Sequence, residues 1–276
     1  MQADIGIFGG SGFYEFLDAV EEFSPSTPFG PPSAPLAVGE IAGRRVAFLP
    51  RHGRHHEFAP AAVPARANLW AMRMLGVSQV IGPCAAGSLS ADVHPGDFVV
   101  LDQLVDRTWG RSDTFYDRGD AHHVAFADPY CPVVAKHAVA VAQRIGVRVH
   151  ATGTVVVIPG PRFATRAESR SYRAQGWDVI NMTQYPEAYL ARELGMHYAG
   201  IALVTDYDTG VEDDPNVAPV SQEEVFRFFE ENVHRVRTLL LELVPELPDS
   251  ASHVFSCRCA GALGPLTSYE AETSEK

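Results

Sequence analysis

The sequence predicts an α/β domain in which helices cover a sheet. Short β-branched runs alternate with segments of helical periodicity, and most of the β-branched runs end in glycine, proline or a polar loop. The chain has 276 residues, of which 46% are hydrophobic and only 20% charged, and this apolar content excludes a disordered protein. We expect one domain, because α/β folds of this length often form a single unit.

The predicted strands indicate where a ligand site would lie. Ligands of α/β sheets bind beyond the strand ends, so polar residues that follow a predicted strand are candidates for the site. The predicted strands cover residues 4–8, 45–49, 79–81, 98–101, 153–158, 179–182 and 198–205.

Helical patterns lie between and after these strands, at residues 63–75, 132–145, 166–175, 186–194 and 221–244. The last helix has the most regular apolar spacing, and Ser221 with Glu224 gives it the sequence of a capping box. Pro, Ser, Gly and acidic residues follow, which predicts a domain over 1–245 and a loosely ordered tail over 246–276. The proline-rich segment 24–35 is expected to be a short surface crossing.

The net charge of −12 does not provide the basic field that nucleic-acid binding requires. An anionic substrate is repelled overall, so a phosphate site must be built locally. Four cysteines are too few for a disulfide framework, and the N-terminus has no secretory pattern. No apolar run approaches the roughly 18 residues of a membrane helix. We therefore expect a soluble cytoplasmic protein with neither nucleic acid nor membrane as a partner.

A glycine-rich turn follows the first predicted strand, in the string IGIFGGSGFY around Ser11. Glycines let the backbone turn sharply and aim N–H groups at an anion. The turn departs from the dinucleotide pattern because Glu15 replaces the third glycine, and from the nucleophile-elbow pattern because Phe13 replaces the last one. A plain tight turn is the alternative interpretation.

A positive cluster follows the second predicted strand, formed by Arg51, His52, Arg54, His55 and His56. Arginine binds phosphate oxygens in a bidentate manner and histidine can donate beside it, so this cluster is the candidate anion site. The histidines lack the spacing of a helical metal motif, but a metal site and a solvated charged loop remain alternatives.

Two acids, Asp206 and Asp208, follow the last predicted strand. In extended geometry their carboxylates share one face and Tyr207 takes the other. Paired acids suit a heterocycle that needs one hydrogen-bond acceptor and one proton donor. A metal-binding or helix-capping acidic turn is the alternative.

A strand-to-helix junction contains Asn181, Met182 and Thr183 in the string VINMTQYPEA. Such a junction presents hydroxyl and N–H groups to ligands. Methionine is also a common filler of cores, which is the alternative for Met182.

Several uncommon strings occur in one order: GGSG, RHGRHH, PCAAGSL, PGD, DRT, FYD, DPYCP, GPRFATRAES, NMTQYPEA and TDYD. In this order they resemble the methylthioadenosine phosphorylase branch of the purine nucleoside phosphorylase family, from Ile5 to about Leu241. The resemblance implies a single-domain, three-layer α/β/α fold with a mixed central sheet. It also implies a homotrimer that uses phosphate as co-substrate and needs no metal or organic cofactor.

The implied activity is phosphorolysis of a 6-aminopurine nucleoside, first of all 5′-methylthioadenosine, to adenine and 5-methylthioribose 1-phosphate. Adenosine, methylthioinosine and 5′-halo-5′-deoxyadenosine remain alternative substrates. A metal-dependent hydrolase that uses the histidine cluster, and a nucleoside-binding sensor without turnover, are competing functions.

The resemblance implies a phosphate site of Ser11, Arg51, His52, Cys84, Ala85 and Thr183. Relatives often have threonine in place of Cys84. A thiol is a weaker donor, so the backbone N–H of Ala85 is expected to matter more, and Cys84 is not expected to act as a nucleophile.

The resemblance also implies the nucleoside site. Phe163 is expected against the purine plane, with Asp206 and Asp208 on its N7 and N6 edge and Met182 against the ribose. A carboxylate accepts from an exocyclic amine, which favours 6-aminopurines. A protonated Asp206 is the expected catalytic acid toward N7. The expected neighbours of the 5′ group are His56, Gln222, Val225 and, from a neighbouring subunit, His123.

Cys257 and Cys259 form a C-x-C pair in the predicted tail. Some thermophilic relatives close such a pair as a strained disulfide. Reduced thiols are expected here because the cytoplasm is reducing, and two cysteines alone do not make a zinc site. No metal ligand is therefore predicted.

Overall fold

The computed structural model describes residues 1–9, 21–118, 121–210, 219–249 and 257–260. Its strands are β1 (Ile5–Gly9), β2 (Glu21–Phe23), β3 (Leu36–Ile41), β4 (Arg44–Pro50), β5 (Gln79–Ser88), β6 (Phe98–Val100), β7 (Gln103–Asp106), β8 (Val149–His150), β9 (Thr154–Val157), β10 (Val179–Asn181) and β11 (His197–Asp206).

The α-helices of the described residues are α1 (Ala65–Met74), α2 (Pro132–Arg144), α3 (Arg166–Ala174), α4 (Gln184–Glu193) and α5 (Gln222–Leu243). Short 3₁₀ turns at Pro60–Ala62 and Val244–Glu246 complete the regular structure there. None of these helices is long and apolar enough to cross a membrane.

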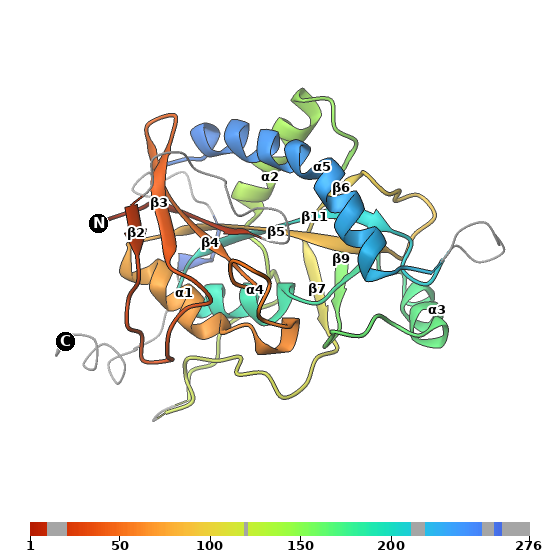
Figure 1. The fold of residues 1–276 in the computed structure, drawn as a ribbon, viewed down its shortest axis with the longest axis horizontal. Helices are drawn as coiled ribbons and strands as arrows, with labels where there is room; N and C mark the ends of the chain where they lie inside the picture. The colour runs from red at the N-terminus through yellow and green to blue at the C-terminus, as the bar shows by residue number, and fades with distance from the viewer. Residues whose placement is uncertain (10–20, 119–120, 211–218, 250–256, 261–276) are drawn as a thin grey trace.

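The strands form one mixed sheet with helices on both faces (Figure 1). The order β2-β3-β4-β1-β5-β10-β9-β7 makes the main path, and β11 pairs with both β5 and β6, which continues to β8. β1 is parallel to β4 and β5, whereas β10 runs antiparallel to β5. This confirms the predicted three-layer α/β/α fold with a mixed central sheet.

β5 and β11 form the centre of this sheet and run parallel over most of their length. Every residue of β11 except Asp206 is buried. Because both of its faces are covered, β11 reads as a continuous apolar run rather than an alternating one. Its length carries the backbone from one end of the fold to the other, where Asp206 emerges.

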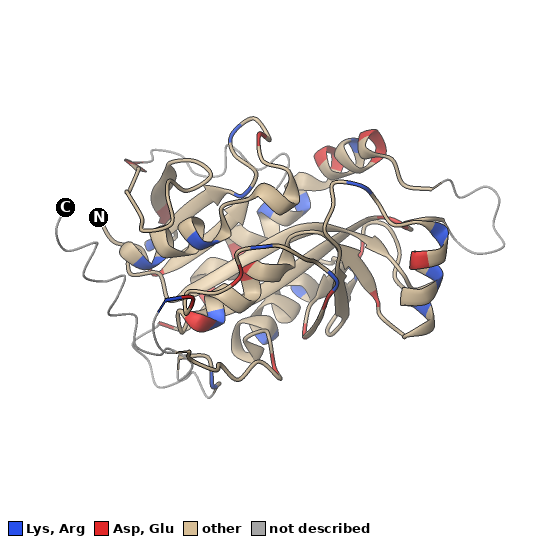
Figure 2. Ribbon diagram, turned by 90° about the horizontal axis from the view of Figure 1, so that it is seen from below, with Lys and Arg blue, Asp and Glu red and all other residues tan. Residues whose placement is uncertain are grey.

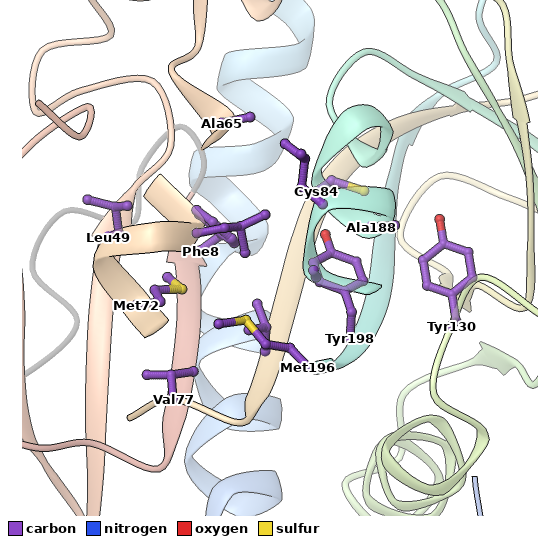
Figure 3. Packing of buried hydrophobic residues seen from close by; sticks show 14 of the residues in the cluster. Phe8, Leu49, Ala65, Met72, Val77, Cys84, Tyr130, Ala188, Met196 and Tyr198 are labelled. Atoms are coloured by element: carbon purple, nitrogen blue, oxygen red, sulfur yellow. The ribbon is translucent and has the colours of Figure 1, made fainter. Parts of the chain in front are cut away.

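Each face of the sheet has its own core. Leu69 of α1 and Ala188 of α4 pack on one face, whereas Val134 of α2 and Leu240 of α5 pack on the other. Figure 3 shows the first core, in which Phe8 and Tyr198 lie among aliphatic and sulfur-containing side chains. Burial of this apolar surface on both faces is the main stabilising contribution to the fold.

The ends of the strongly patterned elements follow the prediction within a few residues, except that β5 continues to Ser88. The short strands β2, β3, β7 and β8 were not predicted. They lie toward the margins of the sheet, where pairing with a neighbour rather than apolar periodicity defines a strand.

The start of α5 differs in one detail from the predicted capping box. The Ser221 hydroxyl accepts from the Glu224 N–H as expected, but the Glu224 carboxylate accepts from that same hydroxyl. The complete capping box belongs to Thr165 and Glu168 at the start of α3. There the glutamate reaches back to the backbone N–H of the threonine.

Ordered contacts continue past residue 245, into the predicted tail. Leu247 is buried, its carbonyl accepts from Arg44, and the carbonyl of Pro248 accepts from Gln79. Farther along, Cys259 is also buried.

Basic and acidic positions are interspersed along the ribbon in Figure 2.

Candidate active site

A cavity of about 430 Å³ lies at the ends of β5, β10 and β11. Its wall is completed by the loop after β4 and by the first turns of α5. Strand ends supply most of its polar groups, as expected for a ligand site of an α/β sheet.

All but two of the predicted site residues line this cavity, namely Arg51, His52, His56, Cys84, Ala85, Phe163, Met182, Thr183, Asp206, Asp208, Gln222 and Val225. Ser11 lies outside the described residues. His123 is exposed and does not line the cavity of this single chain.

The Arg51 side chain is buried and held in one orientation. Its Nε and Nη2 atoms each donate to a different Glu187 oxygen at 2.7 Å, and Nη1 donates to the Pro83 carbonyl at 3.1 Å. The Tyr198 hydroxyl also donates to Glu187. A guanidinium has five N–H groups, so two remain for a ligand in the cavity. Arg51 is thus oriented to donate hydrogen bonds to an anion.

Glu187 was not predicted as part of this arrangement. It lies on α4, far from Arg51 in sequence, and is 2% exposed. A buried glutamate on a helix is unusual unless it is paired with a cation. Its position on the predicted helix was therefore the feature of the sequence that could have indicated a partner such as Arg51.

The His52 and His56 rings stack with their centroids 4.5 Å apart. His52 Nδ1 lies 2.8 Å from the Phe58 carbonyl, so this nitrogen carries the proton that it donates. Burial lowers the pKa of His52 to about 4, which leaves the ring neutral at pH 7. In this tautomer Nε2 is the nitrogen that accepts a hydrogen bond.

Thr183 lies at the junction of β10 and α4. The backbone N–H groups of Thr183 and Gln184 both donate to the Asn181 side-chain oxygen at 3.1 Å, and Asn181 Nδ2 donates to the Thr183 hydroxyl. These two N–H groups are therefore already engaged within the chain. The Thr183 O–H is the donor that this residue can offer.

Asp206 ends β11 and faces the cavity. One carboxylate oxygen accepts from the Thr205 hydroxyl at 2.6 Å and the other accepts from the Asp208 N–H at 2.7 Å. Burial nevertheless raises the pKa of Asp206 to about 6, because loss of water disfavours the carboxylate. Such a group can gain or release a proton near neutral pH.

Asp208 reaches the cavity through a turn and not through extended backbone. Its φ is 54°, in the left-handed region, and it donates its N–H to Asp206. The extended geometry that would put both carboxylates on one face therefore does not continue to Asp208. Burial raises the pKa of Asp208, and its Oδ2 is buried without a hydrogen-bond partner among the described residues. Asp208 thus brings a second carboxyl group with a raised pKa to the wall of the cavity.

Cys84 lies on β5 and is 4% exposed. Burial raises the pKa of its thiol to about 12, so the reactive thiolate does not form at neutral pH. This agrees with the expectation that Cys84 is not a nucleophile.

The cavity also has walls that were not predicted: Glu57, Ala59, Pro60, Ala86, Gly87, Ile158, Pro161, Ile180, Asn181, Thr205, Phe226 and Phe229. Phe226 lies four residues after Gln222, hence on the same face of α5. Its ring meets the His56 ring edge to face, with centroids 5.4 Å apart. Helical spacing from the predicted Gln222 was the signal that could have found it.

Within the described ranges, the histidines of the positive cluster do not converge with Asp206 and Asp208 into a group of potential metal ligands. The cavity instead combines an oriented arginine with buried, protonatable carboxyl groups. This combination suits an anion and a heterocycle bound side by side.

Residues 4–245 match the family described as the phosphorylase superfamily. The chain belongs to this superfamily. It is 54% identical over 239 residues to an S-methyl-5′-thioadenosine phosphorylase of Mycolicibacterium smegmatis, covering 86% of this chain and 89% of that protein. It is also 49% identical to a purine nucleoside phosphorylase of Streptomyces coelicolor, covering 96% of each chain.

Among solved structures, a methylthioadenosine phosphorylase of Schistosoma mansoni in complex with adenine superimposes with a TM-score of 0.83. The two chains are 38% identical, and the match covers 88% of this chain and 91% of the other. The superfamily and these relatives identify the chain as a pentosyltransferase, an enzyme that transfers a pentose group.

Proposed function

We propose that this enzyme cleaves 5′-methylthioadenosine with phosphate, giving adenine and 5-methylthioribose 1-phosphate. The observation that carries the proposal is one cavity lined both by the oriented Arg51 and by Asp206, a half-buried carboxyl with a raised pKa. Relatives named for methylthioadenosine support the choice of substrate. Phosphate is the co-substrate, and the proposal needs no organic cofactor.

In this proposal, phosphate binds to the hydrogen-bonding groups that the chain holds in place. The two remaining N–H groups of Arg51 and the Thr183 hydroxyl donate to phosphate oxygens. His52 Nε2 accepts from a protonated phosphate oxygen, because its Nδ1 proton is already engaged by a carbonyl. Ser11, Cys84 and Ala85 complete the proposed phosphate site.

Asp206 is the proposed catalytic acid. As the bond from C1′ to N9 breaks, its proton passes to purine N7, the bonding electrons go to the base, and the sugar becomes cationic. A phosphate oxygen then bonds to C1′. The negative phosphate also stabilises the cationic sugar electrostatically. No side-chain nucleophile is needed, in agreement with a Cys84 thiol that stays protonated.

Recognition of the base falls to Asp206, Asp208 and Phe163. The Asp208 carboxylate, at the wall of the cavity, accepts from the exocyclic amine in this proposal. A 6-oxopurine presents an oxygen at that point and leaves the acceptor unpaired, which disfavours inosine analogues. Met182 packs against the ribose in this proposal.

The 5′ group is assigned to the wall formed by His56, Gln222 and Val225. Gln222 brings an amide to a wall that otherwise includes Phe226 and Phe229. It leaves adenosine and 5′-halogenated adenosines as further substrates. One relative is named for methylthioadenosine and another for purine nucleosides, and these two classes of substrate differ at the 5′ group.

The test is release of adenine from methylthioadenosine by the purified enzyme, with and without phosphate and with a chelator in the assay. Parallel reactions contain adenosine, methylthioinosine and a 5′-halogenated adenosine. Strictly phosphate-dependent release, fastest with methylthioadenosine, is expected. Release that ignores phosphate but stops with chelator would mean a metal-dependent hydrolase, and tight binding without release would mean a sensor.

We also propose that the enzyme works in the cytoplasm as a homotrimer in which His123 of one subunit reaches the 5′ end of a neighbour's site. The exposed position of His123 in the single chain supports this. In such a trimer a neighbouring subunit would also cover Trp109, which is 81% exposed.

A further inference from the structure

Four potential metal ligands converge at the end of the fold opposite the cavity. Cys131 is the residue before α2, His197 begins β11, and Cys257 and Cys259 come from the C-terminal segment. One donor atom from each lies within 4.8 Å of all the others. The pair Cys257 and Cys259, too small by itself for zinc, thus gains two partners through the fold.

Two of the three measured separations fit a tetrahedral ion, and the third is shorter. Zinc bonds sulfur at about 2.3 Å and nitrogen at about 2.0 Å, so ligand atoms around it lie ~3.5–3.8 Å apart. Cys131 Sγ lies 3.7 Å from Cys257 Sγ and 3.5 Å from His197 Nδ1. Cys257 Sγ lies 3.1 Å from His197 Nδ1. Small movements of the side chains bring all of them to bonding distance of one centre.

The fold holds two of the four ligands rigidly. The Cys131 N–H donates to the Tyr198 carbonyl at 2.7 Å, and the His197 N–H donates to the Ser78 carbonyl at 2.8 Å. The start of α2 is therefore tied to β11. Cys131 and Cys259 are 0% and 1% exposed and His197 is 6% exposed, whereas Cys257 is half-buried, so three of the four ligands are shielded from water. The cysteines also pack in the core between the sheet and α2 and α5, but three thiols gathered around one imidazole form a donor set that suits a soft cation.

We propose that Cys131, His197, Cys257 and Cys259 bind one zinc ion. Three thiolates and one neutral imidazole form a closed tetrahedral set of the type found in structural zinc sites, and thiolate ligands select zinc over magnesium or calcium. The bound centre carries a net charge of −1. The buried Arg192, which donates to the carbonyls of Asp128 and Pro129 just before Cys131, supplies a compensating positive charge.

The zinc has a structural role. All four positions are taken by protein ligands, so none is open for substrate. His197 and Asp206 lie at opposite ends of β11, about 30 Å apart at the rise of a strand. The ion joins α2, β11 and the C-terminal segment, and so fastens that segment to the sheet far from the chemistry.

The experiment is a metal analysis of untagged enzyme purified with a non-thiol reductant and dialysed against metal-free buffer. We expect about one zinc per chain in the wild type and less than about a tenth of that in the Cys257→Ser/Cys259→Ser double variant. Cys84→Ala is the matched control, because it removes the cysteine outside the cluster and should keep its zinc.

A second measurement does not depend on the variants folding. Wild-type enzyme is stripped with a mercurial thiol reagent and chelator, reduced, and titrated with Co²⁺. Uptake of one ion with the visible bands of tetrahedral cobalt and a thiolate charge-transfer band is expected, and Zn²⁺ should displace it and raise the Tm. Absence of zinc from the purified enzyme together with no specific cobalt uptake would overturn the proposal. So would a different metal at one per chain, or a Cys131–Cys257 or Cys257–Cys259 disulfide in the mass spectrum of the reduced preparation.

Discussion

At the scale of single residues, burial shifts the pKa values of two titratable groups of the cavity in opposite directions, and both shifts favour the neutral form. It keeps His52 neutral by lowering its pKa to about 4, and it brings Asp206 toward the neutral acid by raising its pKa to about 6. In both cases loss of water disfavours the charged form. Arg51 remains charged, and its ion pair with Glu187 fixes the orientation of the guanidinium.

Asp206→Asn tests the catalytic acid. We expect kcat to fall by about 10²- to 10⁴-fold, because an amide cannot protonate N7, whereas the KM for phosphate changes little. In the wild type the acid must be protonated, so kcat/KM should fall as pH rises above about 6, and this limb should vanish in the variant. Steady-state kinetics from pH 5 to 9 measure both effects. Turnover like that of the wild type would remove Asp206 from its role as acid.

The same substitution should stabilise the fold at neutral pH. The pKa of Asp206 rises from 3.8 to about 6 on folding, so the folded state binds more protons in that window and loses stability as pH rises through it. The cost reaches about 3 kcal/mol above pH 7, at about 1.4 kcal/mol per unit. Asp206→Asn removes this cost. Urea unfolding should show a gain at pH 7.5 that shrinks by roughly half at pH 5, and a gain independent of pH would contradict the assignment.

At the scale of elements, the site depends on contacts between segments distant in sequence. The loop after β4 brings Arg51 to α4, where Glu187 receives it, and β11 brings Tyr198 to the same carboxylate. One buried carboxylate therefore ties three elements together beside the cavity. Breaking such a group leaves a buried charge without compensation.

Glu187→Ala should destabilise the enzyme by about 3–5 kcal/mol, because Arg51 stays buried without its counter-ion. The matched control is Glu231→Ala on α5. It breaks the exposed pair with Arg227 and should cost less than about 1 kcal/mol. Urea unfolding of both variants at pH 7.5 gives the comparison. Equal costs would mean that the buried pair does not support the fold.

At the scale of the whole molecule, residues of one chain line the cavity. The proposed trimer adds surface residues of neighbouring copies of the chain. Trp109 and His123 are both exposed in the segment between β7 and α2. The proposed trimer would bury this surface and complete the 5′ end of the site.

Light scattering should therefore give a mass of about 90 kDa, three times the 30.0 kDa of the chain. His123→Ala should raise the KM for the nucleoside and leave the KM for phosphate unchanged, since the 5′ end lies away from the phosphate donors. His55→Ala, another exposed histidine, serves as the control and should change neither KM. A clean monomer with full activity would contradict the trimer and the role of His123.

The strongly periodic elements were predictable, and the details of the turns were not. The long apolar pattern of β11 predicts a strand and that of α5 predicts a helix. In contrast, β2 and β8 are defined only by their pairing with neighbouring strands. The acids at the end of β11 were visible in the sequence. The left-handed turn that brings Asp208 back to Asp206 was not, because a residue with a side chain adopts positive φ only where the surroundings enforce it.

The sequence by itself determined the α/β class, the family resemblance and most candidate residues, because periodicity, composition and uncommon strings are local properties of the chain. Only the tertiary structure decided which distant groups meet. It paired Arg51 with Glu187, buried Asp206 enough to raise its pKa, and joined Cys131 and His197 to Cys257 and Cys259. Pairing, desolvation and ligand geometry depend on distances through space, which the order of residues along the chain does not contain.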